Sequence, residues 1–138
     1  STQERAMMST PQEIRAIVKR FTEPWNTGNL GVLDEVCAPN YCLGEENTLE
    51  DLKNGIRAYR KAIPDLHCTL GEVIVEGNSA AYRWTMQGTH GGEFQGYAPT
   101  GKKVSATGIT IVHFAGGKIV HDEFESSPPS FEEQFGMT

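Results

Sequence analysis

A single change of sequence pattern near Pro64 divides this chain into two parts. Before Pro64, apolar residues recur at spacings of three and four, and after it they alternate roughly every second residue. The first spacing is typical of amphipathic helices and the second of half-buried strands. Helices followed by a run of strands predict an α+β fold, because an α/β sheet needs the two kinds of element to alternate along the chain.

The part before Pro64 predicts three helices. The first is expected to start at a capping box at 10–13 and to end at about Asn26. The second is expected from Asn29 to about Pro39, and the third from Thr48 to Pro64. Each start carries a polar residue of the type that accepts hydrogen bonds from the first free N–H groups of a helix. Pro24 is expected to disturb the last turn of the first helix, because proline lacks the N–H that a helix interior uses.

The part after Pro64 predicts four strands, at 66–76, 79–90, 104–115 and 118–126, and a short helix at 131–135. Gly77-Asn78 and Gly116-Gly117 are typical of two-residue hairpin turns. We therefore expect three N-terminal helices packed on a curved, mostly antiparallel sheet of four or more strands. Such a sheet would form a cone whose mouth holds a small-molecule pocket.

Composition and charge exclude several kinds of partner. The 138 residues carry a net charge of −6 without a Lys/Arg cluster, which argues against nucleic acid and anionic membranes. No apolar run approaches the roughly 20 residues of a membrane span. The lack of a signal-peptide pattern and an odd set of three cysteines predict a cytoplasmic protein with reduced thiols. The length predicts one domain over 1–138, with its core at about 10–136.

Several segments carry the motifs of a known family. Residues 88–96 read GTHGGEFQG and residues 99–102 read PTGK. Together they resemble the GTHxGEFxGxxPTGK loop of the SnoaL-like polyketide cyclases. Shorter resemblances follow the family's order at 25–30, 38–41, 63–66, 116–120 and 131–136. In this loop we expect His90 to hold the chain by hydrogen bonding rather than to react.

The resemblance spans about residues 12–136 and implies the nuclear-transport-factor-2-like α+β cone. It implies an enzyme that closes a ring in a polyketide-type ester by an intramolecular aldol reaction, with acid–base catalysis and without metal or cofactor. The implied ligand is small, hydrophobic or aromatic, and polyketide-like. The same fold hosts other activities, so a hydroxylase, an isomerase, a hydrolase and a non-catalytic ligand-binding or dimerisation module remain alternatives.

The last predicted strand supplies the candidate acid–base groups. Counted back from the C-terminal motif without a gap, the family's acid–base aspartate falls at Ser127. Simple alternation then places His121, Glu123 and Glu125 on the same face as Ser127. We therefore expect Glu125, and secondarily Glu123, to face the cavity, where burial would raise the pKa of at least one of them.

Two alternatives remain for that strand. A bulge would reverse its faces, and Asp122, together with His113, would then take the catalytic role. His113 or His121 could also serve as a general base. In the simple hairpin register these two histidines point to opposite faces, which argues against a shared metal. No metal is expected, because the four histidines and three cysteines lack ligand spacing.

The remaining expectations concern substrate contacts and assembly. Phe21, Trp25 and Tyr41 are aromatic residues expected to line the mouth of the cone, and Ser127 is expected to contact the substrate. The exposed face of an antiparallel sheet also favours a homo-oligomer, either a dimer or a tetramer.

Overall fold

The computed structural model describes residues 9–137 and confirms the α+β class. The helices are α2 (Pro11–Thr22), α3 (Pro24–Thr27), α4 (Gly31–Val36), α5 (Leu49–Ala62) and α6 (Phe131–Gln134). The strands are β1 (Cys37–Leu43), β2 (His67–Glu76), β3 (Ser79–Thr89), β4 (Lys103–Ala115) and β5 (Lys118–Ser126). Within residues 9–137, no helix has both the length and the apolar character that crossing a membrane requires.

The helix starts follow the capping residues in the sequence. The Thr10 hydroxyl accepts a hydrogen bond from the Glu13 N–H at 3.1 Å, and Thr48 forms a full capping box with Asp51. The first predicted helix is two helices, because α2 ends at Thr22 and α3 begins at Pro24. Proline has no N–H to donate inside a helix but is well suited to a first turn, which accounts for the break.

The sheet has five strands in the order β1-β5-β4-β3-β2. The four predicted strands form antiparallel pairs, whereas β1 pairs with β5 in parallel. Strand β1 is not among the predicted strands; its first residues, up to about Pro39, fall in the expected second helix, which instead ends at Val36. As an edge strand, β1 has only one pairing side, so the missing N–H of Pro39 is tolerated.

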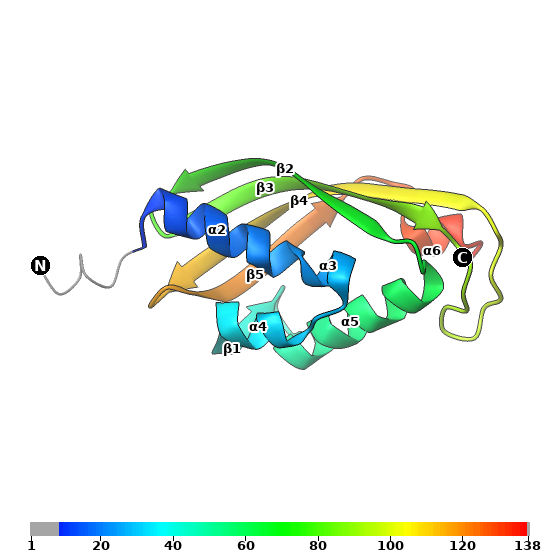
Figure 1. Cartoon of the computed structure of the whole chain (residues 1–138), viewed down its shortest axis with the longest axis horizontal. Helices are drawn as coiled ribbons and strands as arrows, with labels where there is room; N and C mark the ends of the chain where they lie inside the picture. The colour runs from blue at the N-terminus through cyan, green and yellow to red at the C-terminus, as the bar shows by residue number, and fades with distance from the viewer. Residues whose placement is uncertain (1–8, 138) are drawn as a thin grey trace, which may run out of the picture.

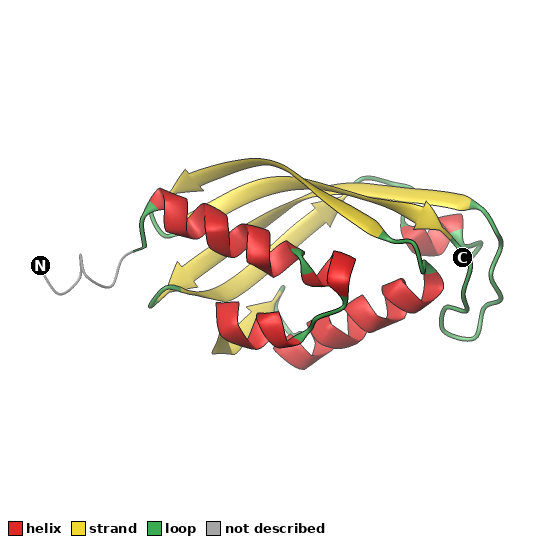
Figure 2. Cartoon of the chain, viewed as in Figure 1, coloured by secondary structure: helices red, strands yellow, loops and turns green. Residues whose placement is uncertain are grey.

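The helices α2 to α5 cover one face of the curved sheet, and α6 lies at the far end of the strands (Figures 1 and 2). Two buried apolar clusters hold these layers together. One lies under α2 and α4 and includes Ile14, Leu33 and Val112. The other joins the end of α5 to α6. Trp25 and Trp84 pack against both clusters, so both tryptophans lie at their boundary.

His90 fixes the long loop between β3 and β4, as predicted. Its ring is fully buried and stacks on Phe135 with ring centroids 3.9 Å apart. Its Nδ1 accepts a hydrogen bond from the Thr100 N–H at 3.2 Å. Its backbone N–H donates to the Lys102 carbonyl at 2.8 Å. The loop motif is therefore a structural device that joins the two strand ends to α6.

Two glycines provide a test of this packing. At Gly92 an added Cβ would overlap the backbone carbonyl of Lys61, whereas at Gly55, inside α5, it would meet open space. We expect Gly92→Ala to lower the free energy of unfolding by about 1–3 kcal/mol. Gly55→Ala should raise it by about 0.5–1 kcal/mol, because alanine loses less backbone entropy in a helix. Urea denaturation measures both, and equal effects of the two variants would contradict the described loop packing.

Candidate active site

A β-bulge at Val120 determines which side chains of β5 face the helices. Next to the Gly116-Gly117 turn, Phe114 pairs with Ile119, but the next pair is His113 with His121. Val120 is thus an extra residue on β5, and every residue after it is shifted by one position relative to the simple hairpin register. An extra residue reverses the faces of the strand beyond it.

The expected orientation of Glu123 and Glu125 is therefore wrong. Both side chains are exposed on the outer face of the sheet, and Ser127 also lies outside the cavity lining. The inward side chains are Asp122, Phe124 and Ser126. The alternative register with a bulge correctly gives Asp122 an inward position. A signal was present, since Ile119 and Phe124 are both suited to an apolar face but stand an odd number of residues apart.

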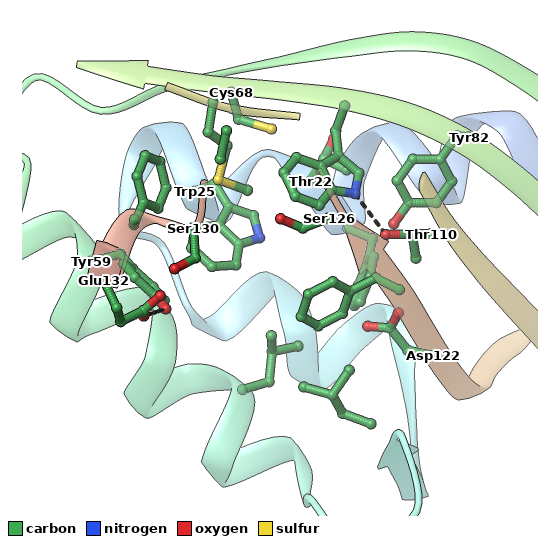
Figure 3. A pocket seen from close by; sticks show the side chains of 18 residues that line it. Thr22, Trp25, Tyr59, Cys68, Tyr82, Thr110, Asp122, Ser126, Ser130 and Glu132 are labelled. Atoms are coloured by element: carbon green, nitrogen blue, oxygen red, sulfur yellow. Dashed lines mark hydrogen bonds between the residues drawn. The ribbon is translucent and has the colours of Figure 1, made fainter. Parts of the chain in front are cut away.

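The concave side of the sheet and the helices enclose a cavity of about 290 Å³ (Figure 3). This lies near the lower end of the range typical of small-molecule sites, roughly 300–1,000 Å³. Its apolar lining comes from α2, α3, α5, α6 and the sheet. At Gly108 an added Cβ would overlap Trp84, so this glycine makes room for the indole that forms part of the cavity wall. The Trp84 Nε1–H donates to the Thr110 hydroxyl at 2.9 Å.

Asp122 is the buried acid of this cavity, with only 4% of its surface exposed. Its Oδ2 accepts a hydrogen bond from the Tyr41 hydroxyl at 2.8 Å, and its Oδ1 is buried without a partner. Burial raises the pKa of Asp122 to about 6, although the Tyr41 hydrogen bond and the nearby His121 act in the opposite direction. A carboxyl group with such a pKa can exchange protons near neutral pH.

The predicted aromatic residues occupy different positions. Phe21 and Trp25 line the cavity, whereas Tyr41 is buried behind Asp122 and contacts its carboxylate. The prediction that Tyr41 lines the mouth is wrong. Half-exposed Phe124, which was not predicted, lines the cavity where it opens to solvent. Whether Phe21 and Trp25 bind substrate stays a prediction.

The two histidines on the neighbouring strands lie on the outer face, away from the cavity. Because of the bulge, His113 and His121 stack with ring centroids 5.6 Å apart, so the expectation of opposite faces is wrong. Together with Glu123 they bring three donor atoms within 4.8 Å of one another. The register argument against a shared metal therefore fails, and metal independence stays a prediction. His113 and Asp122 lie on opposite faces of the sheet, so the expectation that His113 would act together with Asp122 is wrong.

Comparison with known proteins identifies the family of this chain. A model of the SnoaL-like polyketide cyclase family matches residues 15–123. The chain belongs to the SnoaL-like polyketide cyclase family. The matched range includes Asp122 and ends before Glu125 and Ser127.

The chain is also similar to individual proteins. Aklanonic acid methyl ester cyclase AcmA of Streptomyces galilaeus is 32% identical over 115 residues, which cover 77% of this chain and 78% of AcmA. The solved structure of AclR from the same organism, described as a candidate hydroxylase, is 26% identical with a TM-score of 0.81, covering 92% of this chain and 83% of AclR. TsrD of Streptomyces laurentii shares the fold, with a TM-score of 0.83 at 24% identity over 94% of this chain and 99% of TsrD.

The raised pKa of Asp122 predicts a pH-dependent stability. In the folded state this carboxyl binds a proton up to about pH 6, whereas in the unfolded state it releases it near 3.8. The contribution of Asp122 to the free energy of unfolding should therefore fall as pH rises from about 4 to 6, by roughly 2–3 kcal/mol in total. Asp122→Asn should remove this slope and unfold at higher urea concentration than wild type at pH 7.5.

Urea denaturation at pH 4, 6 and 7.5 measures this effect. The matched control is Glu125→Gln, which neutralises an exposed carboxylate of the same strand and should leave the slope unchanged. Equal slopes of the wild type and Asp122→Asn between pH 4 and 6 would show that the Asp122 carboxyl has an ordinary pKa.

Proposed function

We propose that this protein is an acid–base enzyme that closes a ring in a polyketide-type ester by an intramolecular aldol reaction, with Asp122 as the proton-transfer group. The observation that carries the proposal is the Asp122 carboxyl itself. One of its oxygens is held by Tyr41, and the other is buried without a partner beside an apolar cavity. Membership of the SnoaL-like polyketide cyclase family supports the ring-closing activity. In this proposal Asp122 takes the catalytic role that the sequence had suggested for Glu125 and Glu123.

The proposed reaction starts with the ionised Asp122. Its carboxylate takes a proton from a carbon that lies between two carbonyl groups of the substrate. The resulting enolate is delocalised over these carbonyls, so the step does not require a metal or cofactor. The enolate carbon then attacks a ketone carbon of the same molecule and forms the new carbon–carbon bond. The alkoxide produced takes the proton back from Asp122, so that no proton is gained or lost overall.

The protein environment suits both halves of this cycle. A pKa of about 6 leaves Asp122 mostly ionised at neutral pH, yet makes its conjugate base stronger than that of an ordinary aspartate. Burial also raises the pKa of the Tyr41 hydroxyl, so Tyr41 keeps its proton and donates to the carboxylate throughout. The apolar walls exclude water that would solvate the carboxylate and weaken it as a base.

The test uses aklanonic acid methyl ester, the compound that appears in the name of the relative AcmA. Incubation in D₂O separates two events: deuterium uptake at the acidic carbon above the enzyme-free rate reports deprotonation, and a cyclic isomer of the substrate, apart from this exchange, reports ring closure. Asp122→Asn should reduce both by about 10²–10⁴-fold, because a general base is lost. The wild-type rate should rise with pH through about 6, as the carboxylate forms.

Two further variants identify the base. Tyr41→Phe removes a hydrogen bond that lowers the pKa of Asp122, so the rising limb of the pH–rate profile should move to higher pH. Glu125→Gln on the outer face should keep wild-type turnover. If Glu125→Gln abolishes turnover while Asp122→Asn retains it, the proposed assignment is wrong and the sequence-based one is right.

Hydroxylation is the second candidate, because AclR matches over most of its length. It would start with the same deprotonation but would also need dioxygen as the oxidant and a two-electron reductant, which converts the second oxygen atom to water. Its product is distinguished because it gains one oxygen atom. Deuterium uptake without any product would instead indicate the wrong substrate for a competent base. Binding without deuterium uptake would favour a non-catalytic ligand-binding module.

We also propose that two copies of this chain associate through the outer face of the sheet. Ile74, Ile109 and Ile111 are 58%, 50% and 38% exposed there. Ile109 lies between Arg83 and Glu125 in one cross-strand row. A two-fold axis that runs along β4 near Ile109 would therefore bring Arg83 of one copy opposite Glu125 of the other.

We propose a cytoplasmic location as well, because Cys37, Cys42 and Cys68 are free cysteines.

Sedimentation velocity tests the assembly. We expect the wild-type chain to sediment as a dimer or larger homo-oligomer, and Ile111→Glu to sediment as a monomer with an unchanged circular dichroism spectrum. A monomeric wild type at concentrations of about 100 μM, or an Ile111→Glu variant that keeps its oligomeric state, would contradict this interface.

A further inference from the structure

The cavity has a second polar end that the proposed chemistry does not use. Figure 3 shows Tyr82, Thr110 and Asp122 toward one side of the cavity and Tyr59, Ser130 and Glu132 toward the other. Apolar side chains, including Leu52 and Met86, complete the lining. A ligand that fills the cavity would therefore meet polar groups at both of its ends.

The Glu132 carboxylate is the principal group of this second end. Tyr59 donates its hydroxyl proton to Glu132 Oε1, and among residues 9–137 no other hydrogen bond or ion pair reaches this carboxylate. A carboxylate can accept at about four lone-pair positions, so Glu132 retains unused acceptors. The neighbouring Ser130 oxygen accepts from the Glu133 N–H, which leaves its own hydroxyl proton free to donate.

The surrounding structure holds this end in place. Gln134, on the same helix as Glu132, exchanges two hydrogen bonds with the backbone of Ser105, at 3.0 and 2.7 Å. The Tyr59 ring packs against Trp25, Phe94 and Phe131. Burial raises the pKa of the Tyr59 hydroxyl, and its hydrogen bond to Glu132 acts in the same direction, so Tyr59 remains a donor. A carboxylate fixed in this way needs little reorganisation to bind a ligand.

We propose that Glu132, oriented by Tyr59 and assisted by Ser130, is a binding subsite for a hydroxyl or similar hydrogen-bond donor on the end of an aromatic ligand that lies away from Asp122. The subsite selects a donor because Glu132 offers acceptors and carries a negative charge that disfavours ligand anions. It rests on the proposed function only in that the cavity holds the reacting molecule. Its role is orientation, since it determines which end of the ligand reaches Asp122.

Two matched probes test the subsite: 2,6-dihydroxynaphthalene, which carries donors, and 2,6-dimethoxynaphthalene, which does not. Titrations at pH 8 are followed by the indole N–H signals of Trp25 and Trp84 in two-dimensional ¹H–¹⁵N NMR, because both indoles line the cavity. Glu132→Gln should raise the Kd of the dihydroxy probe about 10-fold, because a neutral amide oxygen is a weaker acceptor than a carboxylate. It should leave the Kd of the dimethoxy probe unchanged.

The control is Glu76→Gln, an exposed carboxylate at the end of β2, which should change neither Kd. If Glu132→Gln fails to fold, Glu132→Asp replaces it, because it keeps the charge but withdraws the carboxylate by one methylene; it too should weaken only the dihydroxy probe. Equal effects on both probes, or none, would overturn the subsite and leave the proposed function standing. If neither probe moves the indole signals of the wild-type protein, the subsite proposal fails, whereas the proposed function is still judged by the turnover of aklanonic acid methyl ester.

Discussion

The extra residue Val120 in β5 is the constraint on which the candidate site depends. Without this bulge, His121, Glu123 and Glu125 would point into an apolar enclosure, and each buried charge without a partner would cost several kcal/mol. With it, these ionisable side chains face outward, and the cavity receives Asp122, Phe124 and Ser126. The only charge that β5 brings into the cavity is therefore the Asp122 carboxylate, which Tyr41 partly compensates.

This arrangement links stability and chemistry in one side chain. Burial destabilises the Asp122 carboxylate relative to its protonated form and so makes it a stronger base. The same burial lowers the stability of the folded protein at neutral pH, which is a common trade-off in active sites. Two buried clusters, one under α2 and α4 and one around α6, supply apolar burial that offsets this cost. The cavity lies at their boundary, where Trp25 and Trp84 contact both.

The cavity is assembled from segments that are far apart in the sequence. Phe21 and Trp25 come from the first helices, Tyr59 from α5, Trp84 and Asp122 from the sheet, and Glu132 from α6. Short β turns and the His90 loop fix the strands, while the hydrogen bonds of Gln134 bring α6 against the end of β4. Packing between these distant segments therefore forms a mostly apolar cavity with polar side chains at two of its sides.

The sequence alone determined the α+β class, the family and the limits of most elements. Capping residues, proline and the two hairpin turns are local signals, so they could be interpreted without knowledge of the fold. It also indicated the last strand as the source of candidate acid–base groups, but not which of them faces the cavity, because alternation along a strand is reversed by one unpaired residue. That bulge, the parallel edge strand β1 and the contact between Tyr59 and Glu132 depend on strand pairing and packing between distant segments. Only the tertiary structure could decide these three features. They determine which carboxyl is buried and therefore which carboxyl has a raised pKa.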